Sequence, residues 1–197
     1  IDASGHVRLS AKEAGDAQPV VIDTDTMRIE VATDEQGQEQ PSRMLAIGNV
    51  SAKQQGMTLY TESLDVRMGM AMQEEEAEEQ LAIQHMTAEQ GVEIVVDDPA
   101  LRLVGDHMRI NAVTQQMELF GIPGTPARAI REDGELSCPQ LVMDEGRETL
   151  HVVGPGAFTF EPPTKSQAAE EPEMMTVTWV EAMHFDQKAG FAHFVGN

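Results

Sequence analysis

Short segments in which every second residue is apolar recur along the whole chain. Examples are residues 26–31 (TMRIEV), 107–110 (HMRI) and 182–185 (AMHF). Successive side chains of a β-strand point to opposite faces, so each segment would bury one face and expose the other. A strand pair of this kind cannot cover its own apolar face, and several pairs must pack together. The alternation therefore predicts an all-β fold, an elongated and twisted antiparallel sheet folded over on itself.

Glycines with similar neighbours mark a repeat of these strand pairs. Gly5, Gly48 and Gly91 are spaced 43 residues apart, and Gly121, Gly154 and Gly196 continue the series at 30 to 42 residues. Repeats of this length are typical of stacked-unit architectures. We interpret these glycines as turns that close each unit.

The segments between the strands predict the domain organisation. Residues 32–42 are polar and contain Gly and Pro, which favours a long hairpin loop. Residues 73–80 (QEEEAEEQ) lack an apolar face and predict a solvated hairpin tip, with a calcium site as the alternative. We expect a repeated body over residues 1–160, a Pro/Glu-rich loop or linker over 161–175, and a further, truncated strand pair over 176–197. Both ends interrupt the pattern within a strand, so we expect a longer chain that includes any targeting or anchoring segment.

The charge and composition exclude several classes of protein. The chain has 34 acidic and 13 basic residues, a net charge of −21, which would repel the phosphates of a nucleic acid. A hydrophobic share of 41% is too high for a disordered chain. No apolar run approaches the roughly 20 residues of a membrane-spanning helix. Cys138 is the single cysteine, so no internal disulfide forms, and we expect a structural thiol.

Motifs that carry catalysis or metal binding are not found. The six histidines lack the spacing of a metal-ligand motif, and Asp97 and Asp98 before Pro99 are typical of a turn. The chain has no nucleophile elbow, phosphate loop or dinucleotide fingerprint. We therefore expect no enzyme, no catalytic residue, no metal and no cofactor. A carbohydrate-processing enzyme on a β-solenoid is a weaker alternative, because Trp179 and Tyr60 supplement only six Phe.

Residues 46–66, 86–124 and 138–158 carry a degenerate motif in which Ala-x-Gly-Asn-Val precedes strands that close on Leu-x-Gly-x-Pro. This pattern resembles the OstA-like (LptA/LptC-type) family of periplasmic lipopolysaccharide-transport proteins. The resemblance implies a β-jellyroll opened like a taco shell, which stacks end to end and carries acyl chains in its apolar interior. It also implies a periplasmic protein that acts in outer-membrane biogenesis, and it allows a tether in a segment outside this chain.

The resemblance implies that the partners are lipopolysaccharide or a related amphiphile, and other β-jellyroll proteins or a second copy joined through edge strands. An edge-to-edge assembly or scaffold module without lipid cargo is the main alternative. Core packing without any ligand also produces the apolar alternation. The expected lipid-binding residues are the inward-facing apolar ones: Met27, Ile29, Leu45, Ile47, Leu64, Val66, Ile94, Val96, Met108, Ile110, Leu119, Leu141, Met143, Leu150, Val152 and Phe158.

Overall fold

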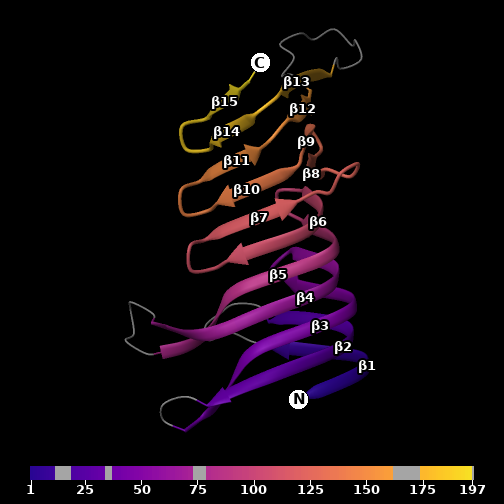
Figure 1. The fold of residues 1–197 in the computed structure, drawn as a ribbon, viewed down its shortest axis with the longest axis vertical. Helices are drawn as coiled ribbons and strands as arrows, with labels where there is room; N and C mark the ends of the chain where they lie inside the picture. The colour runs from indigo at the N-terminus through magenta and orange to yellow at the C-terminus, as the bar shows by residue number, and fades with distance from the viewer. Residues whose placement is uncertain (12–18, 34–36, 73–78, 162–173, 197) are drawn as a thin grey trace.

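The computed structural model describes residues 1–11, 19–33, 37–72, 79–161 and 174–196. Within these ranges the chain forms fifteen antiparallel β-strands of one unclosed sheet and contains no helix, so nothing there crosses a membrane as a helix (Figure 1). The strands lie across the long axis of the molecule, with the two ends of the chain at opposite ends of the stack. The all-β, elongated and twisted fold predicted from the alternation is confirmed.

The strands are long in the first half of the chain and short in the second. The long strands are β1 (Asp2–Ala11), β2 (Val20–Thr33), β3 (Glu39–Gln54), β4 (Met57–Met72), β5 (Glu79–Val96) and β6 (Leu101–Asn111). The short strands are β7 (Gln116–Phe120), β8 (Ala127–Arg131), β9 (Gly134–Cys138), β10 (Gln140–Asp144), β11 (Thr149–Val153), β12 (Gly156–Phe160), β13 (Met175–Trp179), β14 (Ala182–Asp186) and β15 (Phe191–Val195).

The sheet bends along one line, which we call the corner. We call the two halves of the sheet on either side of this line the first face and the second face. Each pair of neighbouring long strands changes register near the middle, for example between Ile47 and Val50 on β3 and between Glu89 and Val92 on β5. Such β-bulges bend a strand and increase its twist. Strand β6 pairs with β7 on one side of the corner and with β8 on the other.

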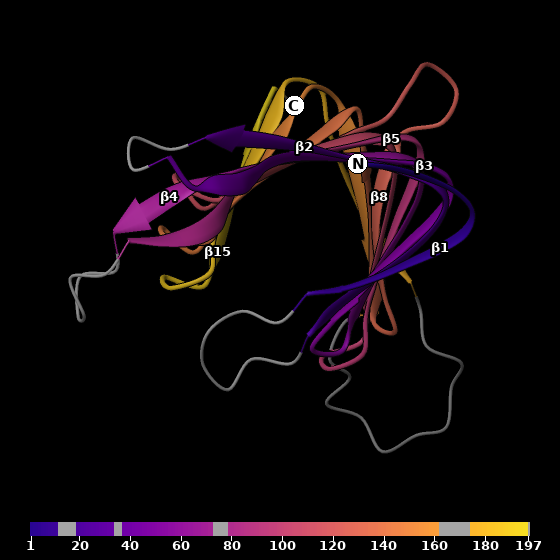
Figure 2. The same ribbon diagram turned by 90° about the horizontal axis from the view of Figure 1, so that it is seen from below.

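Beyond β6 no described strand spans both faces. The first face continues as β7, β10, β11, β14 and β15, and the second face continues as β8, β9, β12 and β13. Seen along the stack, the two faces diverge from the corner (Figure 2).

The glycines of the repeat lie at the corner. Gly48 and Gly91 were expected in turns that close each unit, but they lie inside β3 and β5, with φ of 86° and 81°. The left-handed backbone of a bulge suits glycine, which has no Cβ to clash. Thr24 and Thr61, the buried polar residues at this bend, donate hydrogen bonds from Oγ1 to the carbonyls of Ile47 (3.0 Å) and Glu89 (2.7 Å), respectively. These hydroxyls satisfy carbonyls near the bulged part of the ladder.

The expected loop over residues 32–42 is shorter than the composition indicated. Strand β2 continues to Thr33 and β3 begins at Glu39, because the pairing of the two strands extends to Thr33 opposite Glu39. Most of the acidic segment 73–80 and of the Pro/Glu-rich segment 161–175 lies outside the described residues. Strand β13 pairs with β12, and β14 with β11, so residues after this segment extend the same sheet.

Candidate functional site

Two continuous rows of apolar side chains line the inside of the first face. Directly paired residues of antiparallel strands project to the same side of the sheet, so the strand registers define each row. The inner row, nearer the corner, consists of Met27, Ala46, Leu64, Ala88, Met108, Leu119, Leu141, Val152, Met183 and Phe194. The mouth row, nearer the free rim, consists of Ile29, Met44, Val66, Met86, Ile110, Met117, Met143, Leu150 and Phe185.

A third row on the second face completes the interior. This opposing row consists of Ile22, Ala52, Leu59, Ile94, Leu103, Ala129, Leu136 and Phe158. Its members and those of the first-face rows form one apolar cluster. None of the residues in the three rows is charged, so the interior is a continuous apolar band across the stacked strands.

The inner row and the mouth row differ in how far their side chains are exposed to solvent. Leu64, Met108 and Val152 of the inner row are fully buried at 0% exposure. Ile110 and Leu150 of the mouth row are half-buried. The interior is therefore packed near the corner and accessible near the rim, and a hydrocarbon chain would enter by displacing mouth-row contacts.

Most of the residues expected to face inward do so. Leu64, Val66, Met108, Leu119, Leu141, Val152, Met27 and Ile94 are buried in the apolar cluster, and Ile29, Val96, Ile110, Met143, Leu150 and Phe158 pack against it half-buried. The structure thus brings fourteen of the sixteen expected residues to one interior. Their role in lipid binding stays a prediction.

The inward assignment was wrong for Leu45 and Ile47. Ile47 is 48% exposed, and Leu45 pairs with the outward-facing Arg28 and Asp65. Their neighbours Met44 and Ala46 are buried instead. Residues 44–47 are all apolar, so both alternations fit this segment, and only pairing with β4 selects the inward one.

Sequence reasoning missed several interior residues. Met44, Ala46, Met86 and Ala88 belong to the rows although none was named as a site residue. The two alanines lie opposite Leu64, so small and large side chains alternate across the inner row. These residues lie on the same side of the sheet as Met27 and Leu64, which would have identified them as interior. This can be recognised only when the register between the strands is known.

A cavity of about 200 Å³ opens at the rim between β10, β11 and β14. Met143, Leu150 and Phe185 of the mouth row line it, together with polar residues that include Asp144 and Thr149. Gln116 donates a hydrogen bond to Asp144 (3.1 Å), which lowers the pKa of this carboxyl and keeps it ionised. The cavity therefore combines an apolar floor with a polar, anionic edge.

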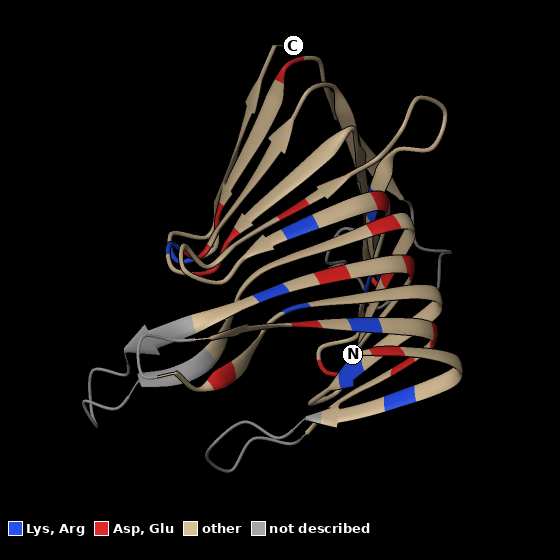
Figure 3. Ribbon diagram, turned by 60° about the horizontal axis from the view of Figure 1, so that its bottom comes forward, with Lys and Arg blue, Asp and Glu red and all other residues tan. Residues whose placement is uncertain are grey.

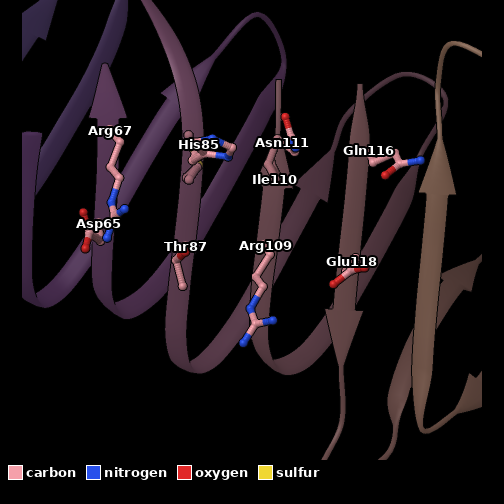
Figure 4. A pocket seen from close by; sticks show the side chains of 10 residues that line it. Asp65, Arg67, His85, Thr87, Arg109, Ile110, Asn111, Gln116 and Glu118 are labelled. Carbon is pink, nitrogen blue, oxygen red and sulfur yellow. The ribbon is translucent and has the colours of Figure 1, made fainter. Parts of the chain in front are cut away.

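A second, larger hollow lies on the outside of the first face (Figure 4). It measures about 450 Å³ and lies over β4 to β7. Its lining is mainly polar and consists of Asp65, Arg67, His85, Thr87, Arg109, Asn111, Gln116 and Glu118, and it is also bordered by Met86 and Ile110, whose side chains pack against the interior. Asp65 accepts two hydrogen bonds from Arg43 (2.6 and 3.0 Å), and the Arg109 guanidinium lies 5.5 Å from the centre of the Phe120 ring. Charges of both signs make this hollow unsuitable for a hydrocarbon chain.

Charged residues also occur along the strands elsewhere in the stack (Figure 3), and none of them belongs to the three apolar rows. Arg28 pairs with Asp2 at 2.7 Å and Arg128 with Glu135 at 2.6 Å, and in each case the two strands are neighbours. The hydrogen bond from Arg128 lowers the pKa of Glu135. The contrast between a charged outside and an uncharged inside gives the molecule its amphipathic character.

The sheet has free edges at both ends of the stack. Strand β1 pairs only with β2, β15 only with β14, and β13 only with β12 among the described strands. A free edge presents backbone donors and acceptors that can pair with another strand. The apolar rows therefore end beside unpaired backbone.

Solved structures include one with a similar fold. The chain is similar to LptH from Pseudomonas aeruginosa, described as the LptA-homologous periplasmic component of the conserved lipopolysaccharide transport device. The TM-score is 0.49 and the sequence identity 16%, and the match covers 81% of this chain and 94% of LptH. No family model matches the sequence, and no curated protein matches it.

Proposed function

We propose that this protein binds the acyl part of lipopolysaccharide, or of a related amphiphile, in its apolar interior and bridges its passage through the periplasm. The observation that carries the proposal is the mouth row, an uninterrupted line of apolar side chains that runs from β2 to β14 and is half-buried except at Met44 and Val66, which are buried. At about 4.8 Å per strand, its nine strands span roughly 40 Å. The family resemblance of residues 46–66, 86–124 and 138–158 supplies the identity of the cargo.

The energetics of the mouth row suit a mobile ligand. Each buried methylene contributes about 0.8 kcal/mol, so even part of an acyl chain is held by several kcal/mol. Met86, Met117 and Met143 are flexible side chains that can adapt to chains of varied shape. The row offers no fixed polar anchor, so a bound chain can move along it.

The free edges support a bridging role. Strand β1 at one end and β15 and β13 at the other can pair with edge strands of another β-jellyroll protein or of a second copy. Such pairing would continue the apolar rows from one molecule to the next. The alternative function, assembly through these edges without lipid, rests on the same strands.

Site-specific photo-crosslinking against purified lipopolysaccharide tests the proposal. A photoreactive amino acid is placed at Ile110 or Leu150, which face inward, and at Arg109 or Ile47, which face outward. Ile47 is a matched control because it is apolar but exposed. We expect strong labelling at the two inward positions and background labelling at the two outward ones.

The outcome separates the two functions. Equal labelling at Ile110 and Ile47 would reject an interior lipid site. Oligomers that grow with protein concentration after removal of lipid, without uptake of a fluorescent acyl probe, would favour the assembly module. Thermal unfolding of each labelled variant confirms that the fold is retained.

A further inference from the structure

Three of the six histidines lie side by side on the outer face near the C-terminal end of the sheet. His151 on β11 is paired in register with His184 on β14, and His184 is paired with His193 on β15. Paired residues share a face, so the three imidazoles project from the same side. The neighbouring Val152 and Met183 face the interior, which places the histidines on the opposite side from the apolar rows.

Two of these rings are already in contact. The Nδ1 atoms of His151 and His184 are 2.7 Å apart, and the ring centroids are 4.0 Å apart. At this distance one Nδ1–H donates a hydrogen bond to the unprotonated Nδ1 of the other ring. Burial, followed by the proximity of His184, lowers the pKa of His151.

We propose that His151, His184 and His193 bind a divalent transition-metal ion, of the class that includes zinc, copper and nickel. Imidazole nitrogen is a preferred ligand of these metals, whereas calcium and magnesium select oxygen. The metal takes the place of the proton that lies between the two Nδ1 atoms, and this proton moves to Nε2 of the same ring, so that both Nδ1 lone pairs face the metal. Water molecules complete the coordination.

The geometry requires only a small adjustment. With zinc–nitrogen bonds of about 2.0–2.1 Å, two tetrahedral ligands lie roughly 3.3 Å apart, so the two Nδ1 atoms must separate by about 0.6 Å. No three potential ligands among the described residues already surround one point. His193 lies one strand away from His184, about 4.8 Å, and its exposed side chain can rotate toward the metal.

The surroundings favour a cation. The chain carries a net charge of −21, which raises the local concentration of cations near its surface. His184 and His193 are both exposed, so an ion reaches them from solvent without opening the sheet. The site is separate from the lipid-binding interior and does not depend on the proposed function.

Calorimetric titration of the protein with Zn²⁺, in an excess of Mg²⁺ that occupies weak carboxylate sites, tests the proposal. We expect one saturable zinc site per chain. His184→Ala, which removes the central ligand, should weaken binding at least tenfold, and His193→Ala should also weaken it measurably. His85→Ala is the matched control, because His85 is exposed on the outer face of β5 and pairs with Arg67 and Asn111 instead of histidine.

Imidazole NMR signals provide a readout that needs no variant. Zinc should shift the signals of His151, His184 and His193 and leave those of His6, His85 and His107 unchanged. Absence of a saturable site, or full affinity in the His184→Ala protein, would overturn the proposal. Unchanged affinity in the His193→Ala protein would overturn the three-ligand site.

Discussion

The thiol of Cys138 illustrates what a single residue contributes to this fold. It is 2% exposed at the end of β9, where it pairs with Ala127 on β8. Burial raises its pKa to about 12 from an ordinary value of 9.0. The thiol therefore remains protonated and packs as a small apolar group, as expected from the sequence.

This raised pKa predicts a pH dependence of stability. Between about pH 9 and pH 12 the folded chain keeps the thiol proton while the unfolded chain loses it, so the free energy of unfolding falls as the pH rises. We expect Cys138→Ala to remove about 1 kcal/mol of the loss measured between pH 7 and pH 10. Chemical denaturation of both proteins at the two pH values measures the difference. An equal loss in both proteins would contradict the prediction.

At the scale of the strands, the corner depends on bulges that only certain residues can form. Gly48 and Gly91 have similar φ values of 86° and 81°. A Cβ at Gly48 would lie 2.6 Å from Asp25 Oδ2 and 2.9 Å from Asp25 Cβ, whereas a Cβ at Gly91 would meet nothing within 4 Å. The two glycines therefore share a conformational requirement and differ in available space.

Alanine substitutions at these two glycines separate strain from steric clash. Gly91→Ala should lower the free energy of unfolding by about 1–2 kcal/mol through left-handed backbone strain alone. Gly48→Ala should lower it further, because the Asp25 side chain and the neighbouring strand must also shift. Urea denaturation of the two variants measures the difference. Equal losses would show that the clash at Gly48 is relieved without cost.

The strands themselves could be predicted because alternation is a local property. Met108 and Ile110 lie on β6 between polar neighbours, so their inward direction follows from the sequence alone. Residues 44–47 are apolar without interruption, and their direction depends on the register with β4. The corner was interpreted as a series of turns, because a glycine with φ above zero is compatible with a turn and with a bulge alike.

The histidine site could not be predicted from the sequence for a similar reason. His151 and His184 are separated by 33 residues, and no short motif connects them. Only the pairing of β11 with β14 and of β14 with β15 aligns the three rings. Contacts of this kind depend on strand order, which a single sequence does not specify.

For the whole molecule, the excess of negative charge determines the long-range electrostatic interactions. Outer-surface ion pairs such as Arg28 with Asp2 are exposed, and pairs of this kind contribute little. The net charge of −21 is unfavourable to a compact state through self-repulsion. Repulsion should therefore outweigh the attraction of the surface pairs.

Salt should accordingly stabilise the protein. Between about 0.01 M and 0.15 M ionic strength the screening length falls from about 30 Å to about 8 Å, which suppresses repulsion across the molecule more than attraction within close pairs. We expect the melting temperature to rise by several degrees over this range, as measured by circular dichroism. A melting temperature that falls with added salt would show that the ion pairs dominate.

The position of β6 makes the molecule mechanically unequal at its two ends. Toward the N-terminus the hydrogen-bonded ladders cross from one face to the other within unbroken strands, so spreading the faces would require those strands to straighten. Toward the C-terminus single connecting segments, such as the one between β11 and β12, join the two faces. Rotation about these connecting segments increases the angle between the two faces without breaking hydrogen bonds between paired strands. The two faces should therefore separate more easily at the C-terminal end of the stack than at the N-terminal end.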